Sequence, residues 1–286
     1  AYDDWCIYRF GKALGKSDKE LKQYRTNAMN YKNVFDSSTS LMRGRKADGS
    51  FESPFDPTAW SRSFTEGDSW HWSWCVFHDP QGLIGLMGGK QKFNSMLDSV
   101  FVVYPDVSSR GIIHEMREMQ VMNMGQYAHG NQPIQHMPYL YSYAGQPWKT
   151  QYWVRQIMRR LYNSTPDGFP GDEDQGGMSS WYVLSALGLY AVTPGTDQYV
   201  IGSPLFRKAT ITMEDGSKFI IEAEGNSADN VYIQSGMLNG RPLDKNYITY
   251  GDIARGGTLK FVMGAQPNRT RNTGKDAAPY SLSAPL

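Results

Sequence analysis

The spacing of apolar residues changes once along this chain, close to Pro194-Gly195, and this change limits the folds that the sequence can adopt. Before it, apolar residues recur at three- and four-residue intervals, the period of a helix with one buried face. The clearest examples are the segments 18–35 and 147–161, where Leu, Tyr, Trp, Ile and Val side chains form continuous stripes. Residues 1–194 are therefore expected to be all-helical.

After Pro194-Gly195 the apolar residues alternate with polar ones, as they do along a strand with one buried face. Two such runs, at 209–213 and 219–223, are joined by Asp215-Gly216, a dipeptide typical of tight hairpins. Residues 195–268 are expected to form an antiparallel β module. The last segment, 269–286, is polar and contains prolines, so we expect a tail that is draped over the surface or loose.

Smaller features complete the expected outline. Shorter helices are predicted at 81–87, 90–101 and 138–143, and His114-Glu115 with Glu118 are placed in a loop. The segment 36–62 is rich in Gly, Ser, Pro and Asp and is predicted to be a long loop, which in a compact domain usually has a function.

The charge balance excludes several classes of partner. The chain has 29 Lys and Arg against 28 Asp and Glu, a net charge of +1, with no run of either sign. Nothing in this pattern indicates binding to nucleic acid or to a membrane surface, and no hydrophobic run has the length of a membrane span. Cys6 and Cys75 lie in apolar surroundings and are interpreted as buried free thiols.

The N-terminus resembles that of an internal fragment or a cleaved chain. The sequence starts at Ala1 without Met, inside a helical pattern, and shows no signal peptide. The compartment stays open: secreted, at the cell surface, or cytoplasmic in a bacterium.

The segment from Gly168 to Trp181 contains three consecutive acids, at 172–174, between pairs of glycines and directly before a helical pattern. Glycine permits backbone shapes closed to other residues, so the acids can be turned into a cleft. The alternative is an acidic first turn that complements the helix dipole, with Asp174 as its cap. One acid would suffice for that, so a site is the favoured interpretation.

A second carboxylate, Glu66, precedes Gly67 and a cluster of tryptophans at 70, 72 and 74. Aromatic surroundings raise a carboxyl pKa and keep the group protonated, as a general acid requires. The alternative is a core segment capped by Glu66. The polar residues from His129 to His136 leave two readings as well: amide oxygens that bind a hard cation or sugar hydroxyls, or the polar start of a helix.

These groups together suit glycoside hydrolysis. The sequence has no nucleophile elbow, no Gly-rich phosphate loop and no Cys/His zinc spacing. It does have separated carboxylates, amides and aromatic residues. One carboxylic acid can protonate the leaving oxygen, while a carboxylate about 6.5–9.5 Å away activates water if the enzyme inverts. A hard cation held by oxygens can polarise or distort the sugar.

Several long motifs in the same order closely resemble glycoside hydrolase family 92, the calcium-dependent inverting exo-α-mannosidases. The motifs extend to about Asn268 and are Glu66-Gly67 with the Trp cluster, Gly130-Asn131-Gln132-Pro133, Tyr143–Thr150, Gly171–Tyr182 and Ile201–Phe206. The resemblance implies an α/α toroid. Residues 1–194 would be the C-terminal portion of the family's (α/α)6 barrel, followed by the antiparallel β module. The family's N-terminal β-sandwich would be absent from this chain, and the missing N-terminal portion would be its partner.

The resemblance also implies roles for individual residues. Glu66 matches the family's general acid. Asp172 and Asp174 match the region of its base, with Asp174 expected to activate water. His114-Glu115 matches a pair that contacts the leaving-group mannose in α-1,2-specific members. Trp70, His78 and Asp79 are further candidates for contacts with the sugar.

The resemblance places a Ca²⁺ ion near Asn131, Gln132 and Asp174. Many members carry Glu where this chain has Gln132. A neutral amide still coordinates calcium but lowers the charge of the site.

The expected activity is removal of terminal α-1,2-linked mannose from high-mannose N-glycans or mannan. Alternatives are an α-1,3-mannosidase of the same family, an (α/α)6 glycosidase acting on α-glucosides, and an inactive mannose-binding, lectin-like relative.

Overall fold

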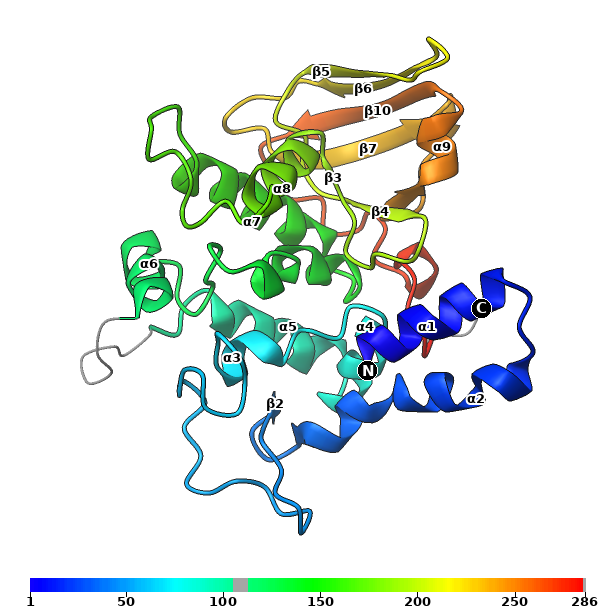
Figure 1. Cartoon of the computed structure of the whole chain (residues 1–286). Coiled ribbons are helices and arrows are strands. Elements are labelled where there is room, and N and C mark those ends of the chain that lie inside the picture. The colour runs from blue at the N-terminus through cyan, green and yellow to red at the C-terminus, as the bar shows by residue number, and fades with distance from the viewer. Residues whose placement is uncertain (105–112, 285–286) are drawn as a thin grey trace. The chain divides into compact units, whose positions relative to one another are not determined.

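The computed structural model describes residues 1–104 and 113–284. The chain divides into two compact units (Figure 1). Unit 1 comprises Ala1–Gly111, Met124–Tyr127 and Ser281–Leu286, and unit 2 comprises Ile112–Asn123 and Ala128–Tyr280. The division runs through the helical region, whereas helices give way to strands only near residue 189. Among the described residues, no helix combines the length and the apolar character needed to cross a membrane.

Unit 1 is mainly helical. Its elements are α1 (Tyr2–Ala13), α2 (Asp18–Asn27), the 3-10 helix η1 (Asn30–Val34), β1 (Phe35–Asp36), β2 (Leu41–Met42), α3 (Ser69–Trp72), α4 (Pro80–Leu86) and α5 (Lys90–Val100). Ser17 and Glu20 form a reciprocal capping box that fixes the start of α2. The single helix expected over 18–35 is wrong beyond Asn27, where a 3-10 turn follows. Asn recurs at 27, 30 and 33 and competes with helical backbone hydrogen bonds.

Unit 2 combines helices and two sheets. Its helices are α6 (His114–Met122), η2 (Gln132–Ile134), η3 (Met137–Ser142), α7 (Pro147–Leu161), α8 (Gly177–Ala186), α9 (Tyr250–Ala254) and η4 (Lys275–Ala277). Its strands are β3 (Leu189–Tyr190), β4 (Gln198–Ile201), β5 (Lys208–Thr212), β6 (Lys218–Glu224), β7 (Tyr232–Leu238), β8 (Arg241–Pro242), β9 (Tyr247–Thr249) and β10 (Gly257–Gly264).

Helix α7 has the predicted bounds. It begins at Pro147, whose fixed φ suits the first helical position, and buries one stripe that includes Val154, Ile157 and Leu161. Helix α8 buries Met178 and Trp181 as its spacing predicts. The expected loop around His114 is wrong, because α6 begins at that residue.

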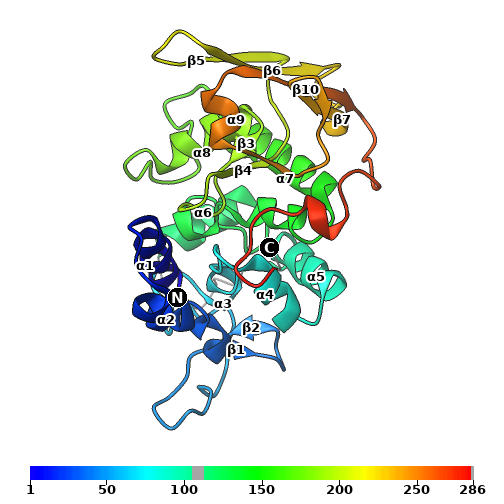
Figure 2. The same cartoon turned by 90° about the vertical axis from the view of Figure 1, so that its right-hand side faces the viewer.

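The larger sheet has the strand order β5-β6-β10-β7-β8 (Figure 2). β5 and β6 form the expected antiparallel hairpin. The expectation of a purely antiparallel module is wrong at β10, which pairs parallel with β6 and antiparallel with β7. The connection from β6 to β10 contains β7, β8, β9 and α9, which is long enough for the crossover that parallel strands need. The smaller sheet, β3-β4-β9, is antiparallel.

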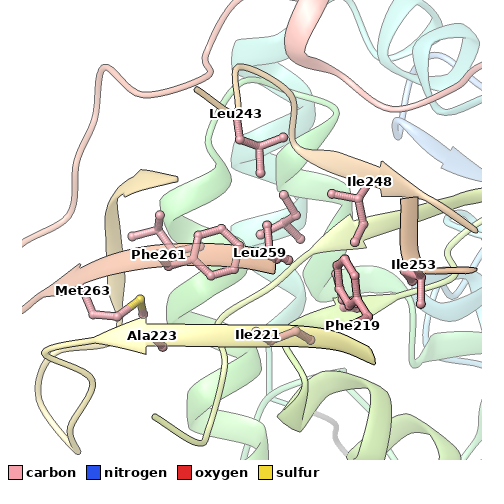
Figure 3. Packing of buried hydrophobic residues seen from close by; sticks show 12 residues of the cluster. Phe219, Ile221, Ala223, Leu243, Ile248, Ile253, Leu259, Phe261 and Met263 are labelled. Atoms are coloured by element: carbon pink, nitrogen blue, oxygen red, sulfur yellow. The ribbon is translucent and has the colours of Figure 1, made fainter. Parts of the chain in front are cut away.

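The core of the larger sheet lies on one face. Phe219 and Ile221 of β6 and Leu259 and Phe261 of β10 point to this face and are almost fully buried (Figure 3). The period-two pattern places them there, because alternate residues of a strand share a face. Helix α7 is joined to this sheet by a hydrogen bond of 3.0 Å from the backbone N of Ile233 to Gln151 Oε1. The β module and α7 therefore fold as parts of one unit.

Candidate functional site

The three consecutive acids have different environments. The N-cap position of α8 is Gly176, and the side chain that caps the first turn is that of Glu173. Its carboxylate accepts hydrogen bonds from the backbone N of Ser179 at 3.2 Å and from Ser179 Oγ at 2.5 Å. Asp172 and Asp174 are exposed. The alternative that Asp174 is the cap is therefore wrong, since its neighbour fills that role. The two aspartates remain available to a ligand.

The backbone turns Asp174 toward a second motif. Asp174, Gln175 and Gly176 have φ values of 45°, 57° and 90°, three successive left-handed residues. This conformation is uncommon for residues with side chains and is often found where a site fixes the chain. Oδ2 of Asp174 accepts a hydrogen bond of 2.7 Å from Nε2 of Gln132. The structure therefore brings together two of the predicted calcium residues.

Helix α6 brings its own polar residues to the same loop. His114 Nε2 lies 3.8 Å from Asp172 Oδ2, and His114 Nδ1 lies 3.4 Å from Glu115 Oε2. Both His114 and Asp172 are exposed, so this pair contributes little to stability. The pair matters because it brings two predicted site residues together. His114 and Asp172 are 58 positions apart in the sequence and lie close to each other within unit 2.

Glu118 is a site residue that the sequence reasoning did not single out. A Cβ built on Gly130 would lie 2.5 Å from Glu118 Oε2, and one built on Gly171 would lie 3.0 Å from it, so two glycines make room for this carboxylate. Burial is the main cause of a raised pKa at Glu118, with His114 acting in the opposite direction. Three nearby carboxylates also raise it, those of Asp172, Glu115 and Asp174.

The spacing of Glu118 offered a signal. Residues three and four apart on a helix are neighbours, so Glu118 shares a face with His114 and Glu115. The assignment of this segment to a loop concealed that relationship. Glu118 accordingly joins the acidic side chains of the candidate site.

A buried aromatic group supports the acidic loop from within unit 2. His129 is fully buried, its Nε2 lies 2.7 Å from Tyr162 Oη, and Trp181 contacts it edge-on at 4.4 Å between ring centroids. Tyr162 Oη also lies 3.2 Å from the carbonyl oxygen of Met178, so the tyrosine hydroxyl links the His129 ring to the start of α8. Burial lowers the pKa of His129 to about 3, and the ring is neutral at physiological pH.

A cavity of about 880 Å³ opens beside these residues, within the range of ligand-binding pockets. Its walls are α6, the end of α7 and the loop that leads to the three acids. The lining contains both polar and apolar residues. Its polar residues include His114, Glu118 and Asp172, whose contacts are described above. The site is thus a cavity whose lining includes the carboxylates of Glu118 and Asp172.

The residues proposed for calcium fit a hard cation by their chemistry. Asn131 is buried directly before η2, and Gln132 and Asp174 are in contact. Amide and carboxylate oxygens are the ligands that calcium prefers. A half-turn of the Gln132 side-chain amide would present its oxygen to a cation. Among residues 1–104 and 113–284, no three His, Cys, Asp or Glu side chains converge as a metal site.

Glu66 lies in unit 1, at the tip of the segment before α3. Its φ is 46°, and its side chain is exposed. The indole Nε1 of Trp72 donates to the carbonyl of Thr65 at 2.8 Å and so holds the backbone beside Glu66. The expectation of a carboxyl enclosed by tryptophans is wrong for the described residues of unit 1, because Trp72 stacks on Phe64 instead.

The three other predicted sugar contacts also lie in unit 1. Trp70 is half-buried on α3. His78 and Asp79 are buried: His78 Nε2 lies 2.7 Å from the carbonyl of Ala28, and Asp79 accepts hydrogen bonds from Tyr31, Ser281 and Ser283. Both side chains are used to join parts of unit 1. Their contact with sugar stays a prediction.

Comparison with known proteins places this arrangement among glycosidases. Residues 1–265 match the glycosyl hydrolase family 92 catalytic domain. The chain therefore belongs to glycoside hydrolase family 92. An uncharacterized secreted glycosidase of the fungus Arthroderma benhamiae is 28% identical over 312 residues, which cover 99% of this chain and 37% of that protein.

Solved structures agree. A family GH92 inverting mannosidase from Bacteroides thetaiotaomicron has a TM-score of 0.89 and 48% identity, covering 99% of this chain and 39% of that one. A family GH92 α-mannosidase of the same bacterium has a TM-score of 0.88 and 38% identity, covering 99% and 36%. That enzyme has also been solved in complex with mannoimidazole. The chain thus spans less than two fifths of the length of these relatives.

Proposed function

We propose that the protein carrying this chain is an exo-acting α-mannosidase that inverts the anomeric configuration and removes terminal α-1,2-linked mannose. High-mannose N-glycans or mannan are its proposed substrates. The observation that carries the proposal is the meeting of Asp172, Asp174 and Gln132 with His114 of α6, beside a cavity, in a member of a family whose solved relatives include an inverting mannosidase.

The roles follow from the chemistry of each group. Glu66, protonated, donates its proton to the glycosidic oxygen while the bond from that oxygen to the anomeric carbon breaks. Asp174 accepts a proton from a water molecule, whose oxygen forms the new bond on the opposite face of the ring. The products are β-mannose and the shortened glycan, and the free acid and base exchange protons with solvent before the next cycle.

The neighbouring residues orient the sugar and tune the base. Asp172 is two residues from Asp174 and lies near His114. In this proposal, the Asp172–His114 pair lies on the leaving-group side of the bound mannose. His114 and Glu115 contact the leaving mannose, which favours the α-1,2 linkage in this proposal.

Asn131, Gln132 and Asp174 would hold a Ca²⁺ ion, which would supply positive charge beside the hydroxyl oxygens of the bound mannose. Glu118 adds negative charge near this position and strengthens the attraction for a divalent cation. These four residues are the proposed cation surroundings.

The test is hydrolysis of α-1,2-, α-1,3- and α-1,6-mannobiose, with and without EDTA, with the released anomer followed by NMR. We expect β-mannose from the α-1,2 substrate first, loss of activity with EDTA, and recovery with Ca²⁺. Asp174→Asn is the matched inactive control. Release of α-mannose would exclude inversion. Binding of mannan without turnover of any linkage would support a lectin-like relative instead.

A further inference from the structure

The cavity continues well beyond the residues that the proposed reaction uses. Its lining runs from His114 at the start of α6 to Met122 and Asn123 at its end. Helix α6 has nine residues and rises about 12 Å from the first to the last. This length exceeds that of one pyranose ring, so the contact of a single leaving-group sugar with His114 and Glu115 leaves the far end of the cavity unused.

The far end is fixed by a hydrogen-bonded contact between two helices. Arg160, in the last turn of α7, donates through Nη2 to the carbonyls of Asn123 at 3.0 Å and Met122 at 3.4 Å. These are carbonyls at the C-terminal end of α6, where a cation is favourable. Arg160 keeps other guanidinium N–H groups in the cavity wall, so it can also serve a ligand.

The cavity lining also contains an aromatic ring on a rigid support. Phe169 is 47% exposed and lines the cavity. Its ring meets that of Tyr162 edge-on, at 5.9 Å between centroids. Tyr162 is itself held by His129 and by the carbonyl of Met178. An exposed ring with a fixed position is suited to pack against the apolar C–H face of a sugar.

The loop before Phe169 has a defined shape. Asn163 Oδ1 accepts hydrogen bonds from the backbone N of Thr165 at 2.9 Å and from its hydroxyl, and the backbone N of Asn163 donates to the carbonyl of Gly168 at 3.2 Å. The loop carries Asp167, an exposed carboxylate in the cavity lining. A carboxylate and an arginine in the lining of one cavity can accept hydrogen bonds from sugar hydroxyls and donate to them, respectively.

We propose that this part of the cavity binds a second sugar on the leaving-group side, the next mannose of a neutral oligomannoside. Phe169 stacks on its ring, and Asp167 and Arg160 bind its hydroxyls. The inference rests on the proposed function and deepens it: the protein prefers oligosaccharides of three or more mannose units over the disaccharide.

The experiment compares kcat/KM for α-1,2-mannotriose and α-1,2-mannobiose in the natural protein that carries this chain. We expect a higher value for the trisaccharide, and in Phe169→Ala and Asp167→Ala a fall in the trisaccharide-to-disaccharide ratio of about tenfold, the size of one lost aromatic or charged contact. Phe206→Ala is the matched control, because Phe206 is 53% exposed in unit 2 and outside the cavity lining.

The outcomes separate the two proposals. If the unmodified protein hydrolyses neither substrate, the proposed function is wrong. Hydrolysis with equal kcat/KM for both, or a ratio that Phe169→Ala and Asp167→Ala leave unchanged, would overturn the second-sugar site alone. Equal losses on both substrates, together with a lower melting temperature, would show that this wall only supports the fold and would also overturn it.

Discussion

The side-chain amide of Gln132 donates a hydrogen bond of 2.7 Å to Oδ2 of Asp174, which joins two loops that are 42 residues apart in the chain. One partner is neutral and the other is a carboxylate. The contact therefore holds the acidic loop in place without the negative charge that a Glu at position 132 would add. The charge of the proposed calcium site depends on this amide.

Replacement of Gln132 by Glu should tighten calcium binding about tenfold, because affinity rises with the number of charged oxygen ligands. Calorimetric titration of calcium into EDTA-treated, dialysed protein measures the change. Gln132→Ala, which removes the oxygen, should weaken binding. Equal affinity in all three proteins would show that residue 132 does not contact the ion.

Replacement of Glu66 by Gln should reduce kcat/KM for mannobiose about a thousandfold, the usual contribution of a general acid. A dinitrophenyl mannoside, whose leaving group needs no proton, should be affected far less. Initial rates on both substrates give the comparison, with Glu214→Gln in an exposed turn as the control. Equal losses on the two substrates would mean that Glu66 is not the acid.

Replacement of Gly171 by Ala should lower activity about tenfold to a hundredfold by moving the acidic loop. The new Cβ would lie 2.6 Å from Cα of Gly130 and 3.0 Å from Oε2 of Glu118, so the backbone next to Asp172 must shift. Gly85→Ala is the control, because a Cβ there meets nothing within 4 Å. Steady-state kinetics and melting temperature should be measured together. Unchanged kinetics in Gly171→Ala would show that the close approach of these loops has no role in catalysis.

Replacement of Asp79 by Asn should destabilise unit 1 by about 2 kcal/mol, because a buried carboxylate loses charged hydrogen bonds. Burial raises the pKa of Asp79, but hydrogen bonds from Ser281, Ser283 and Tyr31 outweigh it and lower the pKa below its usual range. A carboxyl with a lowered folded-state pKa stabilises the protein above its unfolded pKa, about 3.9, and this contribution disappears as pH falls through the folded value.

Urea unfolding at several pH values tests this reasoning. The difference between the original protein and Asp79→Asn should be constant near neutral pH and shrink below about pH 4. Ser38→Ala, which removes a hydroxyl bonded to the carboxylate of Asp36, serves as a comparison for the loss of one such bond. A difference that grows on acidification would reverse the assigned sign of the pKa shift.

The sequence predicted those features that depend on neighbouring residues. α7 has its expected bounds because Pro147 and an uninterrupted apolar stripe both act locally. The hairpin of β5 and β6 follows from Asp215-Gly216 and two alternating runs. α6 was missed because no side-chain cap marks its start at Ile113, although Met116, Met119 and Met122 recur at the three-residue intervals of a helix face.

Long-range arrangements could not be read from spacing. Glu173 takes the capping role because of the left-handed turn at Asp174 to Gly176, and no sequence pattern distinguishes the two acids. The burial of Asp79 depends on Ser281 and Ser283, about two hundred residues later, in a segment expected to be draped or loose. The hydrogen bond between Gln132 and Asp174 is also a long-range contact that spacing does not predict, although the family resemblance named both residues.

The order of the larger sheet has a consequence for biosynthesis. β10 is the central strand, and it alone joins the β5–β6 hairpin to the β7–β8 pair. Until the ribosome has released residues 257–264, both pairs carry open edges with unmet backbone hydrogen bonds, which invite aggregation. A nascent chain that stalls before Gly257 is therefore the most aggregation-prone intermediate of this unit, and chaperone protection matters most at that length.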